Sequence, residues 1–199
     1  MEEVFDEYWR EYLKETIRIC KIMLVDSEML DKLYSIVISI QNCFQRHYKV
    51  MVAGNGGSAA DAQHFAAELV GRFRLNRMGL PAIALSTDTS IITAVSNDYN
   101  FNEIFSRQIE ALGKQGDVFV GISTSGNSEN VVRAVQECTK IGITTICLLG
   151  NDGGKLKGLA DISLIIPSSI TSKIQEMHII LLHLICGEVE KNMQITRNT

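Results

Sequence analysis

The sequence is poor in proline and has no paired cysteine motif. Pro81 and Pro167 are the only prolines among 199 residues, which argues against long coil linkers between folded parts. Neither a CxxC pair nor zinc-finger spacing occurs among the cysteines. Each cysteine lies in an apolar segment, so we expect buried, reduced thiols and no redox or metal role. The five are Cys20, Cys43, Cys138, Cys147 and Cys186.

Long hydrophobic runs and a basic surface are also absent. No apolar stretch approaches the ~20 residues of a membrane span. Residues 1–8 are acidic and aromatic, unlike a signal peptide. The net charge of −4 argues against binding along a nucleic-acid backbone. We therefore expect a cytoplasmic protein that binds neither membrane nor nucleic acid. A small anionic ligand stays compatible with this charge, because a local binding loop does not depend on the total.

The composition fits one globular domain of residues 1–199, with 46% hydrophobic and 21% charged residues. Residues 3–22 and 27–46 have helical periodicity, which makes residues 1–47 a leading helical pair. Two helices before the first strand exceed what one α/β layer needs. Their apolar faces pack either within the chain or against another subunit. An α/β core over residues 48–191 and a polar tail over 192–199 complete the expected organisation.

Strand-like and helical runs alternate from residue 49 onward. Near-continuous apolar strands separated by helices predict a five-stranded parallel sheet with helices on both faces, in a three-layer flavodoxin-like order. Ligands of such sheets bind beyond the carboxyl ends of the strands, where we expect the loops at 54–58, 86–90, 123–128 and 150–154. The expected strands are 50–53, 82–85, 118–122, 144–149 and 162–166. The expected helices are 58–71, 89–97, 102–113, 127–141, 153–160 and 172–191.

The run VMVAGNGGS at residues 50–58 is the first motif with chemical content. An apolar strand breaks into a glycine-rich turn, which can place bare N–H groups around an anion before a helix begins. His64 and Glu68 follow four residues apart, so at ~100° per residue they share one face of that helix. A satisfied structural role remains the alternative for either residue taken alone.

Residues 121–128, GISTSGNS, form the second motif, in which four hydroxyl residues end a strand and lead into a helix. Hydroxyls and free N–H groups at a positive helix end can hold phosphate without a lysine. Helix capping is the alternative, although one hydroxyl would suffice for it. The chain has no Gly-Lys-Ser/Thr P-loop and no GxGxxG spacing, which excludes those two nucleotide motifs.

Weaker candidates lie elsewhere in the chain. Gln175 and His183 are eight residues apart and so share a helix face, although each could be a satisfied core or interface group. Asn97 and Asp98 are typical of turn chemistry. Asp61 is a comparably weak candidate.

These motifs together resemble the sugar isomerase (SIS) domain, and more narrowly the phosphoheptose isomerases. The matching stretches are AGNGGS (53–58), HFAAEL (64–69), Asn97-Asp98, STSGNS (123–128), NDGGK (151–155) and IQEMH (174–178). The resemblance covers nearly the whole chain and implies the SIS fold. It also implies interconversion of sedoheptulose 7-phosphate and D-glycero-D-manno-heptose 7-phosphate, for lipopolysaccharide or capsule.

The resemblance assigns roles to residues and implies a homotetramer with active sites between subunits. It places phosphate on Ser123, Thr124, Ser125 and Ser128. It lines the sugar with Asn55, Gly56 and Gly57, adds substrate contacts at Asn97, Asp98, Glu68 and Gln175, and makes Glu68 and His183 the acid/base pair. Some members carry zinc on the positions matching His64, Glu68, Gln175 and His183.

A non-catalytic relative of the same fold, which binds a replication initiator, supplies the alternative function. That family lacks the carboxylate matching Glu68 and the imidazole matching His183, and this chain has both. We therefore expect an enzyme in which one of these two groups moves the carbon proton and the other serves the oxygens. The sequence does not say which group does which.

Overall fold

A sheet of five parallel strands forms the centre of the computed structural model, which describes residues 2–193. Its order is β2-β1-β3-β4-β5, which confirms the predicted flavodoxin-like arrangement. The register aligns Val52 with Ala84 on one side and Val120 on the other, and Val120 with Ile146. The strands are β1 (Val50–Gly54), β2 (Ala82–Ala84), β3 (Val118–Ser123), β4 (Thr144–Leu149) and β5 (Ile162–Ile165).

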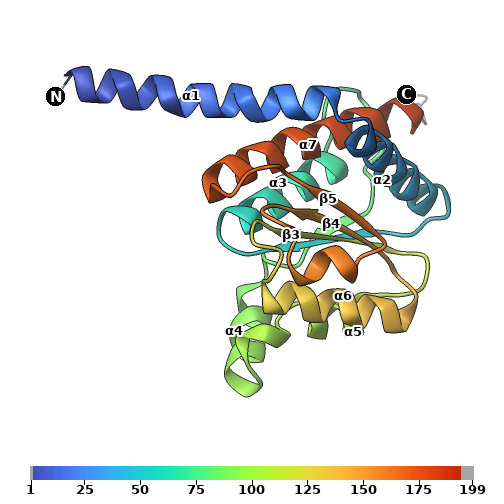
Figure 1. Cartoon of the computed structure of the whole chain (residues 1–199). Coiled ribbons are helices and arrows are strands. Elements are labelled where there is room, and N and C mark those ends of the chain that lie inside the picture. Colours follow the sequence, from blue (N-terminus) through green and yellow to red (C-terminus); the bar gives the residue numbers. More distant parts are fainter. Residues whose placement is uncertain (1, 194–199) are drawn as a thin grey trace.

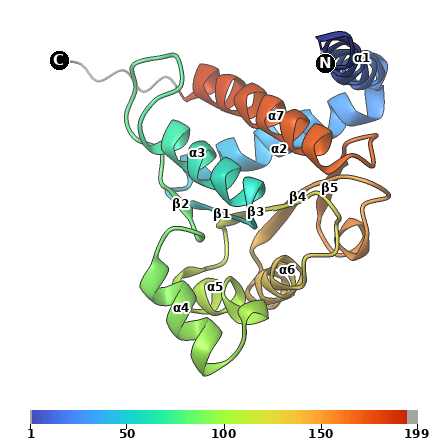
Figure 2. The same ribbon diagram turned by 90° about the vertical axis from the view of Figure 1, so that its left-hand side faces the viewer.

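Helices cover both faces of this sheet (Figure 2). Three of them lie on one face: α2 (Ser27–Gln45), α3 (Gly57–Val70) and α7 (Thr171–Asn192). The opposite face carries α4 (Thr89–Asp98), α5 (Ser106–Leu112) and α6 (Glu129–Ile141). A hydrophobic core lies on each face of the sheet, and alternate strand residues belong to different cores. Val52 and Val120 belong to the first core, and Met51 and Phe119 belong to the second. This alternation follows from successive strand side chains pointing to opposite faces.

Local signals explain several helix ends. The carboxylate of Asp26 accepts a hydrogen bond from Met29 N at 2.9 Å at the start of α2, and Asp88 caps α4 in the same way through Ile91 N. Gly142 ends α6 at a φ of 83°, a left-handed conformation that suits glycine. These ends lie within one or two residues of the predicted boundaries.

The first helix, α1 (Glu2–Val25), extends well beyond the body of the molecule (Figure 1). Its inner part is fixed to α7 by the ammonium of Lys173, which is 2% exposed and lies 2.7 Å from Thr16 Oγ1 and 3.0 Å from Glu176 Oε2. The Tyr12 hydroxyl also donates to Glu176. Lys173 therefore has a structural role, whereas its sequence context alone suggests a solvated surface residue.

Three expectations need correction. The predicted helix 102–113 is a 3-10 turn, η1 (Phe101–Glu103), followed by the separate helix α5. The predicted helix 153–160 is only a short 3-10 turn, η2 (Lys155–Gly158), because the preceding glycines adopt positive φ angles. Cys20 is exposed, while the other four cysteines are buried as expected. Residues 194–199 of the predicted tail lie outside the described part.

None of the helices within residues 2–193 has the length and apolar character that a bilayer crossing requires.

His178 on α7 gives the protein an acid-sensitive element. Its side chain is fully buried, and its Nε2 donates to the carbonyl of Leu149 at 3.0 Å. Burial lowers the pKa of His178 from 6.5 to about 4, and the hydrogen bond to Leu149 only partly opposes this shift. Between pH 6.5 and 4, His178 is therefore protonated in the unfolded chain but neutral in the folded chain.

We expect the free energy of unfolding to fall by about 3 kcal/mol as the pH falls through that window, with no effect of His178 above it. His178→Gln keeps a donor toward Leu149 but does not titrate. Urea unfolding of both proteins at pH 7 and pH 4.5 measures the difference. If the two stability curves run parallel, His178 is not the acid-sensitive group.

Candidate active site

The predicted phosphate loop follows β3 and leads into α6. Ser123 is buried at the end of the strand, and its Oγ lies 2.9 Å from Ser128 Oγ. Ser128 is the N-cap residue of α6, yet its side chain makes no capping hydrogen bond. Capping therefore does not explain this hydroxyl. The loop presents hydroxyls at a positive helix end, the arrangement that suits a phosphate.

A second loop supports the first one from the carboxyl end of β4. Asn151 Nδ2 donates to Thr124 O at 3.1 Å, and Lys155 N donates to Asn127 Oδ1 at 3.1 Å. Gly126 adopts a φ of +66°, and a Cβ at this position would overlap the carbonyl of Gly153. Glycine at 126 is therefore required both by the backbone conformation and by this close approach.

The glycine-rich turn after β1 lies beside the phosphate loop. Asn55 and Asn130 exchange two side-chain amide hydrogen bonds of 2.9 Å each, which joins the turn to the first turn of α6. Gly56 has a φ of +54°, and a Cβ at Gly57 would lie 3.4 Å from Gln175 Cγ. The structure thus brings together the residues predicted to line a sugar with Gln175 of α7.

Asp61, a weak candidate in the sequence, directly contacts a predicted ligand. Its Oδ1 accepts from Gln175 Nε2 at 2.6 Å, and the side chain is 4% exposed. Burial raises the pKa of Asp61, although the hydrogen bond from Gln175 and the nearby His64 oppose the rise. The hydrogen bond to Asp61 uses the amide nitrogen of Gln175, and no residue within 2–193 donates to its carbonyl oxygen, which can therefore meet a substrate or a metal ion.

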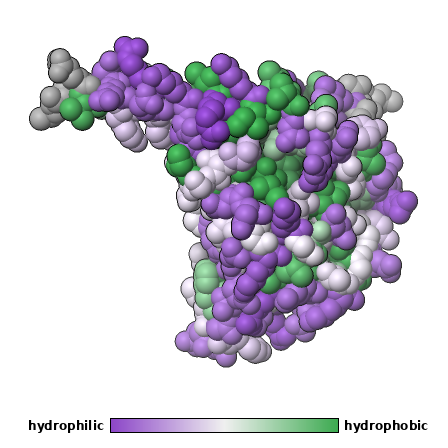
Figure 3. All heavy atoms as spheres, viewed as in Figure 1, coloured by the Kyte–Doolittle hydropathy of each residue, from purple (hydrophilic) through white to green (hydrophobic). Residues whose placement is uncertain are grey.

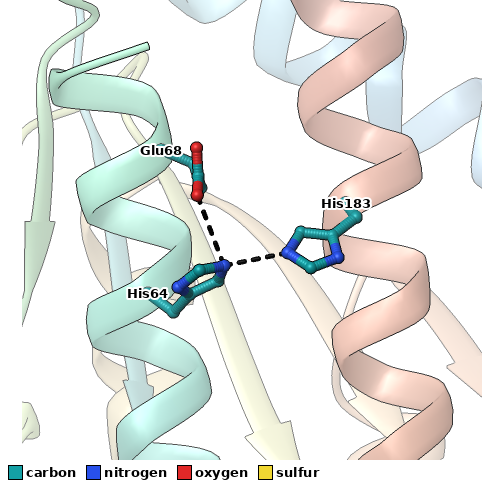
Figure 4. Close-up of side chains that lie close together, drawn as sticks. All are labelled: His64, Glu68 and His183. Atoms are coloured by element: carbon teal, nitrogen blue, oxygen red, sulfur yellow. Dashed lines mark hydrogen bonds and ion pairs between the residues drawn. The ribbon is translucent and has the colours of Figure 1, made fainter. Parts of the chain in front are cut away.

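Two imidazoles and one carboxylate meet between α3 and α7 (Figure 4). His64 Nε2 lies 2.8 Å from His183 Nε2 and 3.4 Å from Glu68 Oε1. His64 and Glu68 come from one face of α3, as their spacing predicts, and His183 comes from α7. At a distance of 2.8 Å one of the two imidazoles donates an N–H hydrogen bond to the other. This arrangement places the Glu68 carboxylate and the His183 imidazole close enough to act together in proton transfer.

The same three residues fit a metal ion by the chemistry of their donors. Their ligand atoms all lie within 4.8 Å of one another, and two imidazole nitrogens with one carboxylate oxygen are common zinc ligands. Three protein ligands are also the number found in catalytic zinc sites. Gln175 would be an unusual fourth ligand, through its oxygen.

Asn97 and Asp98 lie apart from this group within one chain. They end α4, on the opposite face of the sheet from α3 and α7 (Figure 2). Their side chains are exposed, and Asn97 Nδ2 donates to Asp98 Oδ1 at 2.9 Å. The structure of one chain does not bring this pair to Glu68 or His183.

The sequence interpretation missed several residues around the group. Phe73 stacks on His183 with ring centroids 5.4 Å apart and an interplanar angle of 21°. Arg77 and Glu190 form a buried ion pair nearby. Asn130 could have been inferred as a partner for Asn55, because it lies in the first turn after the hydroxyl-rich loop. No motif or periodicity indicates the other three.

Comparison with known proteins agrees with the geometry. Residues 11–150 match the model of the SIS domain family. A phosphoheptose isomerase of Clostridium acetobutylicum is 49% identical over 91% of this chain and 92% of its own length. The structure of a phosphoheptose isomerase from Neisseria gonorrhoeae superposes with a TM-score of 0.89 at 41% identity, covering 94% of this chain and 99% of that one.

A second solved structure, of a phosphoheptose isomerase from Francisella tularensis, gives a TM-score of 0.88 at 36% identity, over 93% of this chain and 97% of that one. These similarities cover almost the whole chain and include the helices that carry the group around Glu68. The protein is therefore an isomerase with the SIS fold and belongs to the phosphoheptose isomerase family.

Proposed function

We propose that this protein interconverts sedoheptulose 7-phosphate and D-glycero-D-manno-heptose 7-phosphate by moving a proton between C1 and C2 through an enediol. The observation that carries the proposal is that Glu68 and His183 meet at the same atom, His64 Nε2, at distances of 3.4 and 2.8 Å. Such a reaction needs both a positioned base and a positioned acid. The names of the relatives add the substrate class.

The contacts along the rim arrange the site from a phosphate end to a proton-transfer end. The hydroxyl-rich loop leads into α6, whose Asn130 is hydrogen-bonded to Asn55. A Cβ at Gly57 would touch Gln175, which is hydrogen-bonded to Asp61. Along α3, His64 lies about one helical turn beyond Asp61, and Glu68 lies about two turns beyond it. A sugar that carries phosphate on C7 and reacts at C1 and C2 needs its phosphate site and its proton-transfer groups at opposite ends of the binding site. Binding energy at the phosphate would then hold the reacting carbons against the acid/base pair.

In the proposed reaction Glu68 takes the carbon proton and returns it to the neighbouring carbon. His183 supplies a proton to the carbonyl oxygen and removes one from the hydroxyl. Asn55, Gly56 and Gly57 lie along the sugar, and Ser123, Thr124, Ser125 and Ser128 hold the phosphate. The roles of Glu68 and His183 could be exchanged without changing the overall proton balance.

The test is conversion of sedoheptulose 7-phosphate by purified protein, followed by product analysis with NMR. Turnover with exchange of solvent deuterium into the product would support the enediol. An inert protein that still binds the sugar phosphate would contradict the proposal. The alternative function, a scaffold for a replication initiator, has no use for the paired Glu68 and His183, and the relatives compared above are named isomerases.

Zinc is the metal that we propose for His64, Glu68 and His183, with Gln175 as a fourth ligand. When bound, it would polarise the carbonyl and stabilise the negative charge that develops on oxygen. A Glu68 that ligates zinc is a weaker base, so the two roles of this residue compete.

We expect zinc to raise the melting temperature of metal-free protein by roughly 5–10 °C at 100-fold excess over its Kd. His183→Ala should abolish the rise, whereas His47→Asn, which changes a histidine outside the site, should retain it. Differential scanning calorimetry measures the shift. Equal melting temperatures with and without zinc in the wild type would exclude a specific site.

The same proposal includes a homotetramer whose active sites form between subunits. An apolar groove of about 520 Å³ lies between the end of α1, the start of α2 and α7, and Leu24, Leu30 and Leu184 are exposed along it. Figure 3 shows apolar side chains gathered below α1. Residues 1–47 would then pack against other copies, and a neighbouring chain could supply Asn97 and Asp98. Sedimentation equilibrium showing a monomer would contradict this assembly.

We place the reaction in the cytoplasm, since charged sugar phosphates do not cross a bilayer unaided. Its product would enter the synthesis of nucleotide-activated heptose for lipopolysaccharide or capsule.

A further inference from the structure

The loop of residues 71–80 connects the end of α3 to the start of the segment that becomes β2, and it lies against α7. It is therefore in contact with both helices that supply the proposed acid/base pair. Half of its side chains are exposed, but Arg77 is only 7% exposed and Leu80 is buried. A buried arginine in a partly exposed loop indicates a specific partner.

That partner is Glu190 on α7, which is 1% exposed. Its carboxylate accepts hydrogen bonds from the backbone N–H groups of Phe73, Arg74 and Leu75 at 2.9, 2.8 and 2.9 Å. Arg77 Nε lies 3.1 Å from Glu190 Oε1. Burial would raise the pKa of Glu190, but the three N–H donors and Arg77 outweigh it and the pKa is lowered. The carboxylate is thus charged and fully engaged in holding the loop on α7.

The other end of the Arg77 guanidinium holds the end of α3. Arg77 Nη2 donates to the carbonyl of Glu68 at 2.8 Å. Its Nη1 donates to the carbonyls of Leu69 and Met78 at 2.8 and 2.9 Å. The last carbonyls of a helix have no partners within it, and a cation there also suits the helix dipole. Arg77 therefore binds the backbone of the residue that carries the proposed base.

Phe73 completes the connection on the side of α7. Its backbone is fixed by Glu190, and its ring stacks on His183 with the two planes inclined by 21°. The guanidinium carbon of Arg74 lies 5.0 Å from the centroid of the same ring. Stacking restricts the rotation of the imidazole, so the ring of Phe73 defines where His183 Nε2 points.

We propose that Phe73, held in place by the buried Arg77–Glu190 pair, is a positioning residue that orients His183 toward His64 and Glu68. The inference rests on the proposed function for the catalytic roles of these two groups. The orientation itself is a property of the structure and can be tested without turnover. A positional error of about 1 Å in a reacting group can cost up to ~100-fold in rate, so we expect a measurable effect on kcat.

The experiment combines kinetics with NMR of histidine rings in protein labelled with ¹³C-histidine. The chain has four histidines, so His183→Gln assigns the His183 signal by its disappearance. Phe73→Leu removes the ring but keeps an apolar side chain, Phe73→Tyr keeps the ring, and Glu190→Gln removes the charge that holds the loop. Asn76→Ala changes an exposed residue of the same loop and serves as the matched control.

For Phe73→Leu and Glu190→Gln we expect kcat to fall about tenfold with KM within about twofold of wild type, and the His183 ring signal to shift. Phe73→Tyr and Asn76→Ala should keep the wild-type kcat and signal. If the loop had only a structural role, Phe73→Leu and Glu190→Gln would lower the melting temperature but would not change kcat and the His183 signal together. Should Glu190→Gln fail to fold, the comparison of Phe73→Leu with Phe73→Tyr still tests whether the ring of Phe73 orients His183.

An unchanged His183 signal in Phe73→Leu would overturn the proposal, and so would an unchanged kcat in an active enzyme. If the wild type proves inert, the proposed function fails. The NMR comparison then decides whether Phe73 orients His183, because it needs no substrate.

Discussion

Replacing Glu68 by glutamine is expected to lower kcat by about a thousandfold, within the range attributed to general acid–base catalysis. Glutamine keeps the size of the side chain but cannot take up the carbon proton. KM should change little, because the phosphate loop lies on other elements. The measurement is steady-state turnover of sedoheptulose 7-phosphate, together with the rate at which the substrate exchanges its carbon-bound proton with deuterated water.

The exchange rate also separates the two possible roles. If Glu68 moves the carbon proton, the Glu68→Gln variant loses exchange and turnover together, whereas His183→Ala retains slow exchange. The reverse pattern would assign the carbon proton to His183. Glu110→Gln, which changes an exposed carboxylate on α5, is the control and should behave as wild type. Full turnover by Glu68→Gln would remove Glu68 from the mechanism.

Replacing Gly126 by alanine should disrupt the phosphate loop and raise KM about 100-fold, which corresponds to the loss of roughly two charge-assisted hydrogen bonds. Gly126 has a φ of +66°, and an added Cβ would overlap the carbonyl of Gly153 and lie 2.8 Å from Gly154 N. Because these neighbours are backbone atoms, the two loops must separate to admit the methyl group. The hydroxyls would then no longer converge on one phosphate.

The matched control is Gly158→Ala, where an added Cβ meets nothing within 4 Å. Kinetics with sedoheptulose 7-phosphate and competition by inorganic phosphate measure both variants. We expect inorganic phosphate to inhibit the wild type and Gly158→Ala alike, and Gly126→Ala much less. A KM for Gly126→Ala close to that of wild type would mean that the phosphate binds elsewhere.

The sheet was predictable because its strands are apolar runs separated by helical segments, with glycine-rich turns after β1 and β4. The predicted bounds of β4 match the structure, and those of β1 and β3 differ by one residue at the carboxyl end. The alternation of strands and helices predicts a parallel sheet, and the observed order is β2-β1-β3-β4-β5. Helical spacing likewise predicted that His64 and Glu68 share a face. These features depend on contacts between neighbours in sequence or on simple periodicity.

The contacts between α3, α7 and the loop at 71–80 could not be predicted in the same way. Phe73 stacks on His183, and Arg77 pairs with Glu190, but more than 100 residues separate the members of each pair. An arginine and a glutamate in such positions are ordinarily solvated, so their types alone give no signal. The predicted helix at 153–160 gave too little weight to Gly153 and Gly154, whose positive φ angles are incompatible with a helix. The break between η1 and α5 has no glycine or proline to indicate it.

The separation of His64 and His183 by 119 residues has a consequence for synthesis on the ribosome. All five strands and α3 are complete before α7 emerges. A nascent chain that stops at the end of β5 thus contains the whole sheet and half of the acid/base pair. It also lacks the partner for the buried guanidinium of Arg77. If Glu68 and His183 act as proposed, a chain that ends before α7 lacks His183 and is expected to be inactive.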